Sequence, residues 1–229
     1  MPALVELTNV YAYSGDGRLL FEDVNLSLGN GEKVFLAAPL GSGKSLFLNW
    51  LAGVERPDKG TVRVLGHDIS VLDAGALNAL RCRLGLIIKD NALISNLKVI
   101  ENCALPLLYH TDMPHDEAMK KARSLLDSTG FTGDPWELPG PLPNYAKKQI
   151  AIARSLALDP EIIICENLGD GLTSGERARL FELILGYHAG AGSRLLLVTS
   201  TDKFDAAFVK PDRVLRIENN RITEDGASA

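Results

Sequence analysis

Residues 38 to 45 read APLGSGKS, and this stretch constrains the chain more than any other feature. Its spacing is that of a phosphate-binding loop, in which a glycine position and four further residues precede Gly-Lys-Ser. The apolar run at 33–37 before it is typical of a strand, and the run at 46–52 after it is typical of a helix. Strand, loop and helix in this order indicate a phosphate loop rather than an ordinary glycine-rich turn. The loop residues are Ala38, Pro39, Leu40, Gly41, Ser42, Gly43, Lys44 and Ser45, with Leu46 next.

The glycines, the lysine and the serine of this loop each contribute to binding phosphate or a metal ion. Gly41 and Gly43 allow backbone N–H groups to close around phosphates, and the start of the following helix adds a favourable dipole. Lys44 supplies a positive charge for the β and γ phosphates. The hydroxyl of Ser45 is a suitable ligand for Mg²⁺. The first glycine position holds Ala38 instead.

Composition limits the number of domains, the class of partner and the cellular compartment that we expect. The 229 residues are 46% hydrophobic, which is enough for a substantial core, and we expect one domain over 1–229. A net charge of -5 argues against nucleic acid as a partner. We expect no membrane span and no secretion signal, because no run approaches about 20 apolar residues and no basic segment leads into an apolar one. Cys82, Cys103 and Cys165 have no metal spacing and suit reduced thiols in a cytosolic protein.

Hydrophobic periodicity predicts strands and helices along the whole chain. Strands are expected at 3–11, 19–28, 33–37, 61–64, 161–165 and 195–199, with a hairpin at 213–222. Helices are expected at 74–80, 99–110, 116–128, 146–156 and 174–187, with a loop at 135–144. Strands alternate with helices at both ends of the chain, which predicts an α/β fold with a mixed sheet and a helical subdomain inserted at about 80–157. We expect the four histidines on surfaces, and Lys147 and Lys148 on a solvated helix face.

Three further segments carry a resemblance to the ATP-binding subunits of ABC transporters. They are LAGVERPDKGTVRVLGHDI at 51–69, AIARSLALDPEIIIC at 151–165 and DRVLRIENNRI at 212–222, and their order and spacing agree without a large gap. The resemblance implies a P-loop NTPase fold of the ABC ATPase type, with an ATP-binding core, an antiparallel β subdomain and a helical subdomain. It also implies ATP and Mg²⁺ as cofactors and a dimer in which each ATP lies between one phosphate loop and the partner's signature loop. Homodimer and heterodimer both stay open. A membrane permease is the implied partner, which would place the chain in the cytoplasm on the inner face of the membrane.

The acidic pair of this family departs from its usual form. Counting without a gap from Glu161 places Glu166 at the position of the metal-binding Asp and Asn167 at the position of the catalytic Glu. Glu166 can hold Mg²⁺ through water, whereas Asn167 cannot accept a proton at neutral pH. A rival register makes Cys165 the Asp position and Glu166 the base, and it requires an insertion before Gly171.

Two other positions near the γ-phosphate are also altered. By the resemblance, Ser200 stands where the family has its switch His, and it has no positive form that could stabilise charge. Lys89 stands where the family has the Gln of the glutamine loop, and its cation would repel the metal. Thr173 replaces the Asp that contacts the dimer partner, and Leu46 lies where a hydroxyl is common.

The signature loop is the most altered motif. It aligns with Leu142, Pro143, Asn144, Tyr145 and Ala146, so the Ser hydroxyl and Gly N–H groups that would face a partner's ATP are missing. Pro143 has no N–H, and Tyr145 adds bulk where backbone must approach closely. For adenine stacking, Tyr13 is the candidate, although it fits an ordinary surface or strand tyrosine equally well.

The retained features contact ATP in its ground state, whereas the altered ones serve the transition state or dimer closure. The sequence therefore predicts an ATP-binding transporter subunit with weak or absent hydrolysis. The alternatives are an active transport ATPase, a purely regulatory or structural subunit, and a soluble ABC protein. Residues 95–110 resemble the matching segment of lipid-transport and lipoprotein-release ATPases, which favours the Mce-associated lipid type. By the same resemblance a permease helix would dock along Asn91 to Leu108, on apolar residues that otherwise pack the subdomain: Leu93, Leu97, Val99 and Leu105.

Overall fold

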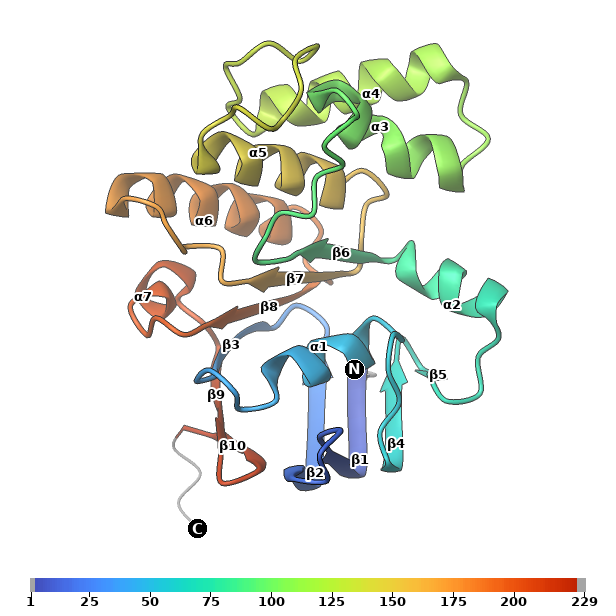
Figure 1. Cartoon of the computed structure of the whole chain (residues 1–229), viewed down its shortest axis with the longest axis vertical. Coiled ribbons are helices and arrows are strands. Elements are labelled where there is room, and N and C mark those ends of the chain that lie inside the picture. Colours follow the sequence, from blue (N-terminus) through green and yellow to red (C-terminus); the bar gives the residue numbers. More distant parts are fainter. Residues whose placement is uncertain (1–2, 226–229) are drawn as a thin grey trace.

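The computed structural model describes residues 3–225 and contains two sheets (Figure 1). The smaller sheet has four antiparallel strands in the order β2-β1-β4-β5. It is built from β1 (Ala3–Tyr13), β2 (Leu19–Gly29), β4 (Lys59–Val64) and β5 (His67–Asp68). Alternating burial along β1 and β2 shows that one face of this sheet packs into the core while the other faces solvent.

The larger sheet has six strands in the order β10-β9-β3-β8-β7-β6. Neighbouring strands are parallel except for β10, which is antiparallel to β9. The carboxyl ends of parallel strands meet at one edge of a sheet, which is where ligands bind in such folds. The strands are β3 (Lys33–Ala37), β6 (Leu84–Ile87), β7 (Ile162–Glu166), β8 (Leu195–Ser200), β9 (Arg213–Glu218) and β10 (Arg221–Glu224).

The six-stranded sheet is covered on both faces, so its central strands are buried throughout. On one face, α1 (Lys44–Leu51) lies between the two sheets, and its Trp50 ring packs 5.0 Å from that of Phe21 in β2. On the other face lie α5 (Asn144–Ser155), α6 (Ser174–Ala189) and the short α7 (Asp205–Val209). The last two loop residues, Lys44 and Ser45, already belong to α1, so packing of this helix fixes the end of the loop in place.

A separate helical layer lies at the end of the molecule opposite the four-stranded sheet (Figure 1). In this layer α3 (Val99–His110) and α4 (His115–Ser128) pack against α5 around buried residues such as Ile100, Cys103 and Ile150. Helix α2 (Ala74–Arg81) precedes β6. Within residues 3–225, every helix is too short or too polar to span a bilayer.

The predicted α/β fold with a mixed sheet, an antiparallel sheet and a helical insertion is confirmed. Three short elements were missed, namely β5, β6 and α7, and β6 lies inside the 80–157 range although it belongs to the six-stranded sheet. The helix expected from residue 146 begins at Asn144, because Pro143 sits at its cap and cannot continue a helix toward the N-terminus.

Two surface predictions were wrong. Lys148 is only 1% exposed and His188 only 7%. Lys148 lies on the face of α5 turned toward the sheet, and burial lowers the pKa of its ammonium below the usual range. The short stretch KK gives no periodic signal, so sequence alone could not show which of the two lysines faces inward.

We expect only one of the three cysteines to react in the folded protein. Burial raises the pKa of the Cys103 and Cys165 thiols to about 12, which leaves both protonated and shielded, whereas Cys82 is partly exposed. Brief iodoacetamide treatment at neutral pH, followed by peptide mass spectrometry, should therefore label Cys82 alone, with the urea-unfolded chain as control. Equal labelling of Cys165 in the folded chain would contradict the packing described here.

Candidate functional site

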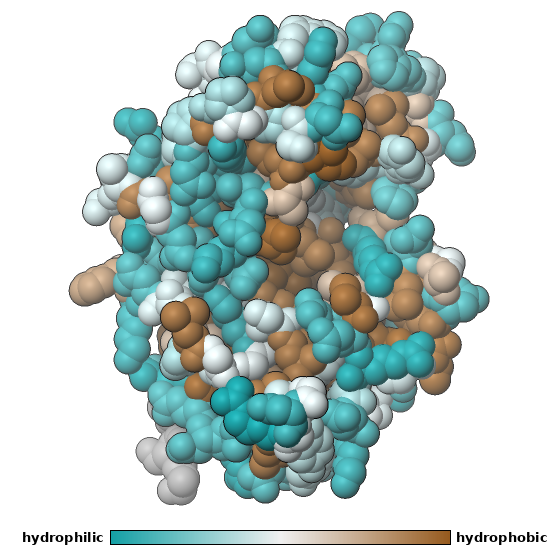
Figure 2. All heavy atoms as spheres, viewed as in Figure 1, coloured by the Kyte–Doolittle hydropathy of each residue, from teal (hydrophilic) through white to brown (hydrophobic). Residues whose placement is uncertain are grey.

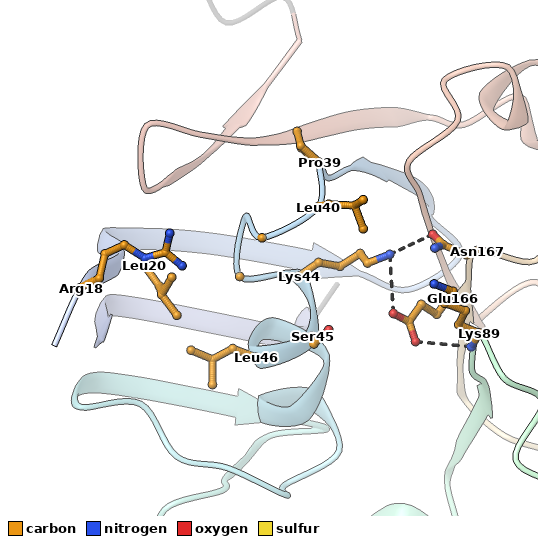
Figure 3. Close-up of a pocket in the computed structure, with 12 residues that line it drawn as sticks. Arg18, Leu20, Pro39, Leu40, Lys44, Ser45, Leu46, Lys89, Glu166 and Asn167 are labelled. Carbon is orange, nitrogen blue, oxygen red and sulfur yellow. Dashed lines mark hydrogen bonds and ion pairs between the residues drawn. The ribbon is translucent and has the colours of Figure 1, made fainter. Parts of the chain in front are cut away.

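A cavity of about 370 Å³ lies beside the phosphate loop, at the carboxyl edge of the six-stranded sheet (Figure 3). The loop and the start of α1 form one wall, and the end of β7 with Lys89 forms the opposite wall. The lining residues are Arg18, Leu20, Pro39, Leu40, Gly41, Gly43, Lys44, Ser45, Leu46, Lys89, Glu166 and Asn167. Most of the predicted cofactor-binding residues are thus brought together in one place.

The two glycines of the loop are required by its backbone. Gly41 and Gly43 have φ angles of 76° and 95°, which disfavour other residues. A Cβ atom on Gly43 would also meet the Phe21 ring at 2.7 Å. Ala38 has no positive φ and is 2% exposed, so the loop accommodates a methyl group where the motif has its first glycine. Leu40 is 85% exposed at the tip of the loop.

The Lys44 side chain crosses the cavity to the end of β7 (Figure 3). Its ammonium donates to Oδ1 of Asn167 at 2.8 Å and lies 3.5 Å from Oε1 of Glu166. The other oxygen of Glu166 accepts from the backbone N–H of Lys89 at 3.4 Å. Lys44 therefore joins the phosphate loop to the two residues at the end of β7.

Glu166 and Asn167 differ from Cys165 in their access to the cavity. Glu166 and Asn167 both line the cavity, whereas Cys165 is 0% exposed within β7 and does not. Asn167 adopts a left-handed φ of 48°, and its N–H donates to the carbonyl oxygen of Thr199 at 2.8 Å. Its side chain is thereby directed at Lys44 and presents a neutral amide to the cavity.

The residues that line this cavity suit a nucleoside triphosphate with a hard metal ion. No acidic residue occupies the first turn of α1, so the positive end of that helix is unopposed by charge. Ser45 and Glu166 both supply oxygen atoms to this cavity. Within residues 3–225, no group of three or more His, Cys, Asp or Glu side chains is placed to hold a metal ion. Two protein oxygens suit Mg²⁺, which commonly takes its other ligands from phosphates and water. Lys89 lines the same cavity and adds positive charge.

Ser200 is not part of this cavity. It is 1% exposed, and its hydroxyl donates to Oδ2 of Asp205 at 2.8 Å. Asp205 is fully buried, which raises the pKa of its carboxyl, and it also accepts from Arg177 at 3.1 Å. Ser200, which the sequence analysis placed at the switch position, is thus held in a network within its own chain.

The residues predicted to form the signature loop likewise contact their own chain, and none lines the cavity. Leu142 and Ala146 pack against the helical core, and Tyr145 packs against the core beneath α6. Asn144 donates to the carbonyl oxygen of Asp170 at 3.1 Å and accepts from Asn91 at 3.4 Å. Thr173 caps α6, because its hydroxyl oxygen accepts from the N–H of Glu176 at 3.4 Å. In return, the backbone N–H and the hydroxyl of Thr173 both donate to the Glu176 carboxylate at 2.8 Å.

Two cavity residues were missed by the sequence analysis, namely Arg18 and Leu20. They enter the cavity from the turn after β1 and from the start of β2, and no motif marks them. Tyr13, the candidate for adenine stacking, ends β1 with 42% of its surface exposed and is not among the lining residues. The alternation of apolar residues in β2 could have indicated that Leu20 faces the loop, but not that Arg18 does.

The chain is similar to known proteins along most of its length. The sequence profile of the family described as ABC transporter matches residues 21–167. The "probable ribonucleotide transport ATP-binding protein mkl" of Mycobacterium leprae is 33% identical over 199 residues, which cover 87% of this chain and 57% of that protein. The lipoprotein-releasing system ATP-binding protein LolD of Chromohalobacter salexigens is 29% identical over 96% of this chain and 91% of its own length. The chain thus spans little more than half of the first relative.

The fold has a close structural counterpart. A dimeric, post-hydrolysis structure of the ATP-binding cassette MJ0796 bound to ADP and Pi superimposes with a TM-score of 0.88 at 27% identity, covering 98% of this chain and 99% of that one. The profile match extends over the phosphate loop and ends at Asn167, so it contains both walls of the cavity. The chain belongs to the ATP-binding proteins of the ABC transporter family.

Proposed function

We propose that this chain binds Mg-ATP at the cavity beside the phosphate loop, hydrolyses it weakly or not at all, and passes its nucleotide state to a membrane permease. Residues 1–229 would act as one ATP-binding domain, with the helices within 80–157 as its subdomain. The observation that carries this proposal is the pair formed by Lys44 and Asn167, in which the phosphate-loop cation faces a neutral amide.

Binding in this proposal depends on groups that the chain keeps. The glycine N–H groups and the start of α1 would surround the phosphates, and Lys44 would exchange Asn167 for phosphate oxygens. Ser45 and Glu166 would hold Mg²⁺, which when bound neutralises phosphate charge. Arg18 and Leu20 would border the rest of the nucleotide.

Hydrolysis in this proposal is limited by groups that the chain lacks. A general base typically contributes about 10²–10⁴ in rate, and the amide of Asn167 cannot take a proton from water. Ser200 cannot replace a switch histidine, since its hydroxyl is bound to buried Asp205. These losses affect one site, so their effects are not additive.

The ATP-binding partner would complete each site in a dimer. A partner's phosphate loop would face Pro143, Asn144 and Tyr145 of this chain, two of which contact their own chain through side chains. In a mixed dimer, we infer that remaining hydrolysis belongs to the partner's phosphate loop, since the site on this chain's loop lacks its base.

A groove between the sheet and the helical layer suits a permease helix. Figure 2 shows a hollow with apolar residues where α2 and β6 approach α3. Part of it is a 190 Å³ pocket lined by Arg81, Cys82, Leu84, Leu86, Pro106, His110, Arg154, Ser155 and Leu158. Of the docking segment expected at Asn91 to Leu108, Pro106 is the residue that lines this pocket. Val99 is fully buried and cannot take part, because it packs the helical core.

Lipid is the substrate class we propose. The support is the resemblance of residues 95–110 to lipid-transport ATPases and the 29% identity with LolD over nearly the whole chain.

Removal of the Lys44 ammonium should abolish most nucleotide binding. Because a hydrogen bond to a charged group is worth about 1.5–3 kcal/mol, Lys44→Ala should weaken Mg-ATP binding at least ~10-fold by calorimetry. Lys121→Ala, on the exposed side of α4, is the matched control and should bind like wild type. Absence of wild-type binding at millimolar ATP would refute the proposal.

Restoring a carboxylate at position 167 alone should increase ATP hydrolysis only slightly. We expect Asn167→Glu to raise phosphate release by less than ~10-fold, since Ser200, Lys89 and the signature loop stay altered. A phosphate-release assay on the purified chain measures this, with Lys44→Ala as background. Wild-type turnover of about 1 per second or faster, lost in Lys44→Ala, would show that another residue is the base, and Glu166 would be the first candidate.

A negative charge in the groove beside β6 should weaken the association of the chain with membranes. Leu158→Asp places a carboxylate against the expected apolar permease helix, whereas Phe204→Asp changes a residue that is 79% exposed and lies outside the groove. Flotation of cell membranes should find less of the first variant and unchanged amounts of the second, with equal ATP affinity in both. Equal membrane association of Leu158→Asp and wild type would place the permease contact elsewhere.

A further inference from the structure

The helical layer contains a second groove that neither the nucleotide nor the permease proposal uses. It has a volume of about 450 Å³ and lies between the start of α3, the helix α4 and the segment that follows α4. Four apolar residues and two cations line it: Ile100, Met119, Pro135 and Trp136, with Lys120 and Arg123. It shares no lining residue with the nucleotide cavity or with the pocket beside β6.

Backbone hydrogen bonds hold the walls of this groove in place. The N–H groups of Val99 and Ile100 donate to the carbonyl oxygens of Glu137 and Pro135, each at 2.9 Å, so the segment after α4 is fixed to the start of α3. The N–H of Trp136 donates to Oδ1 of Asp134, also at 2.9 Å. The indole of Trp136 is nevertheless 56% exposed. A large aromatic surface is thus presented on a preformed wall, which lowers the ordering cost of binding.

The two charged side chains that line the groove, those of Lys120 and Arg123, are both cations. No carboxylate lines it, and within residues 3–225 Lys120 has no ion-pair partner. Arg123 binds Asp127 through Nε at 2.9 Å, which leaves its terminal nitrogens for another acceptor. A third cation, the ammonium of Lys98, lies 5.2 Å from the centre of the Trp136 ring. An anion is the complementary ligand group for this rim.

We propose that this groove binds an amphipathic monocarboxylate of the free fatty acid class. The apolar chain would lie on Trp136, Met119 and Pro135, where the flexible methionine can adapt to it. The carboxylate would lie between Lys120 and Arg123, which donate to it. A chain of about ten carbons suits a groove of this size.

The test uses decanoate as the probe and the indole N–H signals as the readout. The chain has two tryptophans, Trp50 in the core and Trp136 in the groove, so an ¹⁵N-labelled sample gives two such signals. Decanoate below its micelle-forming concentration should shift the Trp136 signal saturably and leave Trp50 unchanged. Lys120→Gln with Arg123→Gln should weaken this binding about three- to tenfold. Lys121→Gln, an exposed neighbour outside the groove, is the matched control and should bind like wild type.

Three results would overturn the proposal. One is the absence of a saturable shift of the Trp136 indole N–H signal at millimolar decanoate. Another is equal binding of decyltrimethylammonium, which would show that apolar contact alone is recognised. The third is unchanged decanoate affinity in the double glutamine variant when its Trp50 signal confirms folding. Because no nucleotide is present, these outcomes are independent of whether the chain binds ATP.

Discussion

The Lys44 ammonium lies 2.8 Å from the amide oxygen of Asn167, and this contact joins the two halves of the candidate site. Lys44 begins α1, which is packed between the two sheets, and Asn167 follows β7, which lies between β8 and the edge strand β6 of the six-stranded sheet. Both residues are nearly buried. Their positions are therefore set by the core, and the cavity between them follows from how β3 and β7 end on the same edge of the sheet.

Asn167 also connects the cavity to helix α5. The carbonyl oxygen of Asn167 accepts from buried Lys148 of α5 at 3.5 Å, and Asn144 at the start of that helix donates to Asp170. Further along α5, Arg154 donates to the carbonyl oxygens of Asn91 and Ala92 at 2.8 and 2.7 Å. One helix thus holds the backbone after β6 and after β7, which together form the wall opposite the phosphate loop. If nucleotide draws Lys44 away from Asn167, α5 is the element placed to respond.

Much of this architecture could be predicted from sequence because its signals are local. The phosphate loop, the strand before it and the helix after it lie within twenty residues, and hydrophobic periodicity located the long helices. The short strands β5 and β6 were missed because two to four residues carry no periodicity. Burial of Lys148 and the tie between Ser200 and Asp205 depend on tertiary packing, so no local pattern encodes them. The cavity role of Arg18 likewise arises because a turn distant in sequence folds over the loop.

The central claim is that this chain keeps nucleotide binding while its chemistry is lost, and one sample can test both parts. Excess protein is mixed with limiting γ-labelled Mg-ATP, and bound nucleotide and released phosphate are followed together over hours. We predict that most of the nucleotide is bound at protein concentrations above the calorimetric Kd and that the bound species remains ATP. Conversion of the bound ATP to ADP within seconds would contradict the account, because it would require a working base in a site where Asn167 faces Lys44.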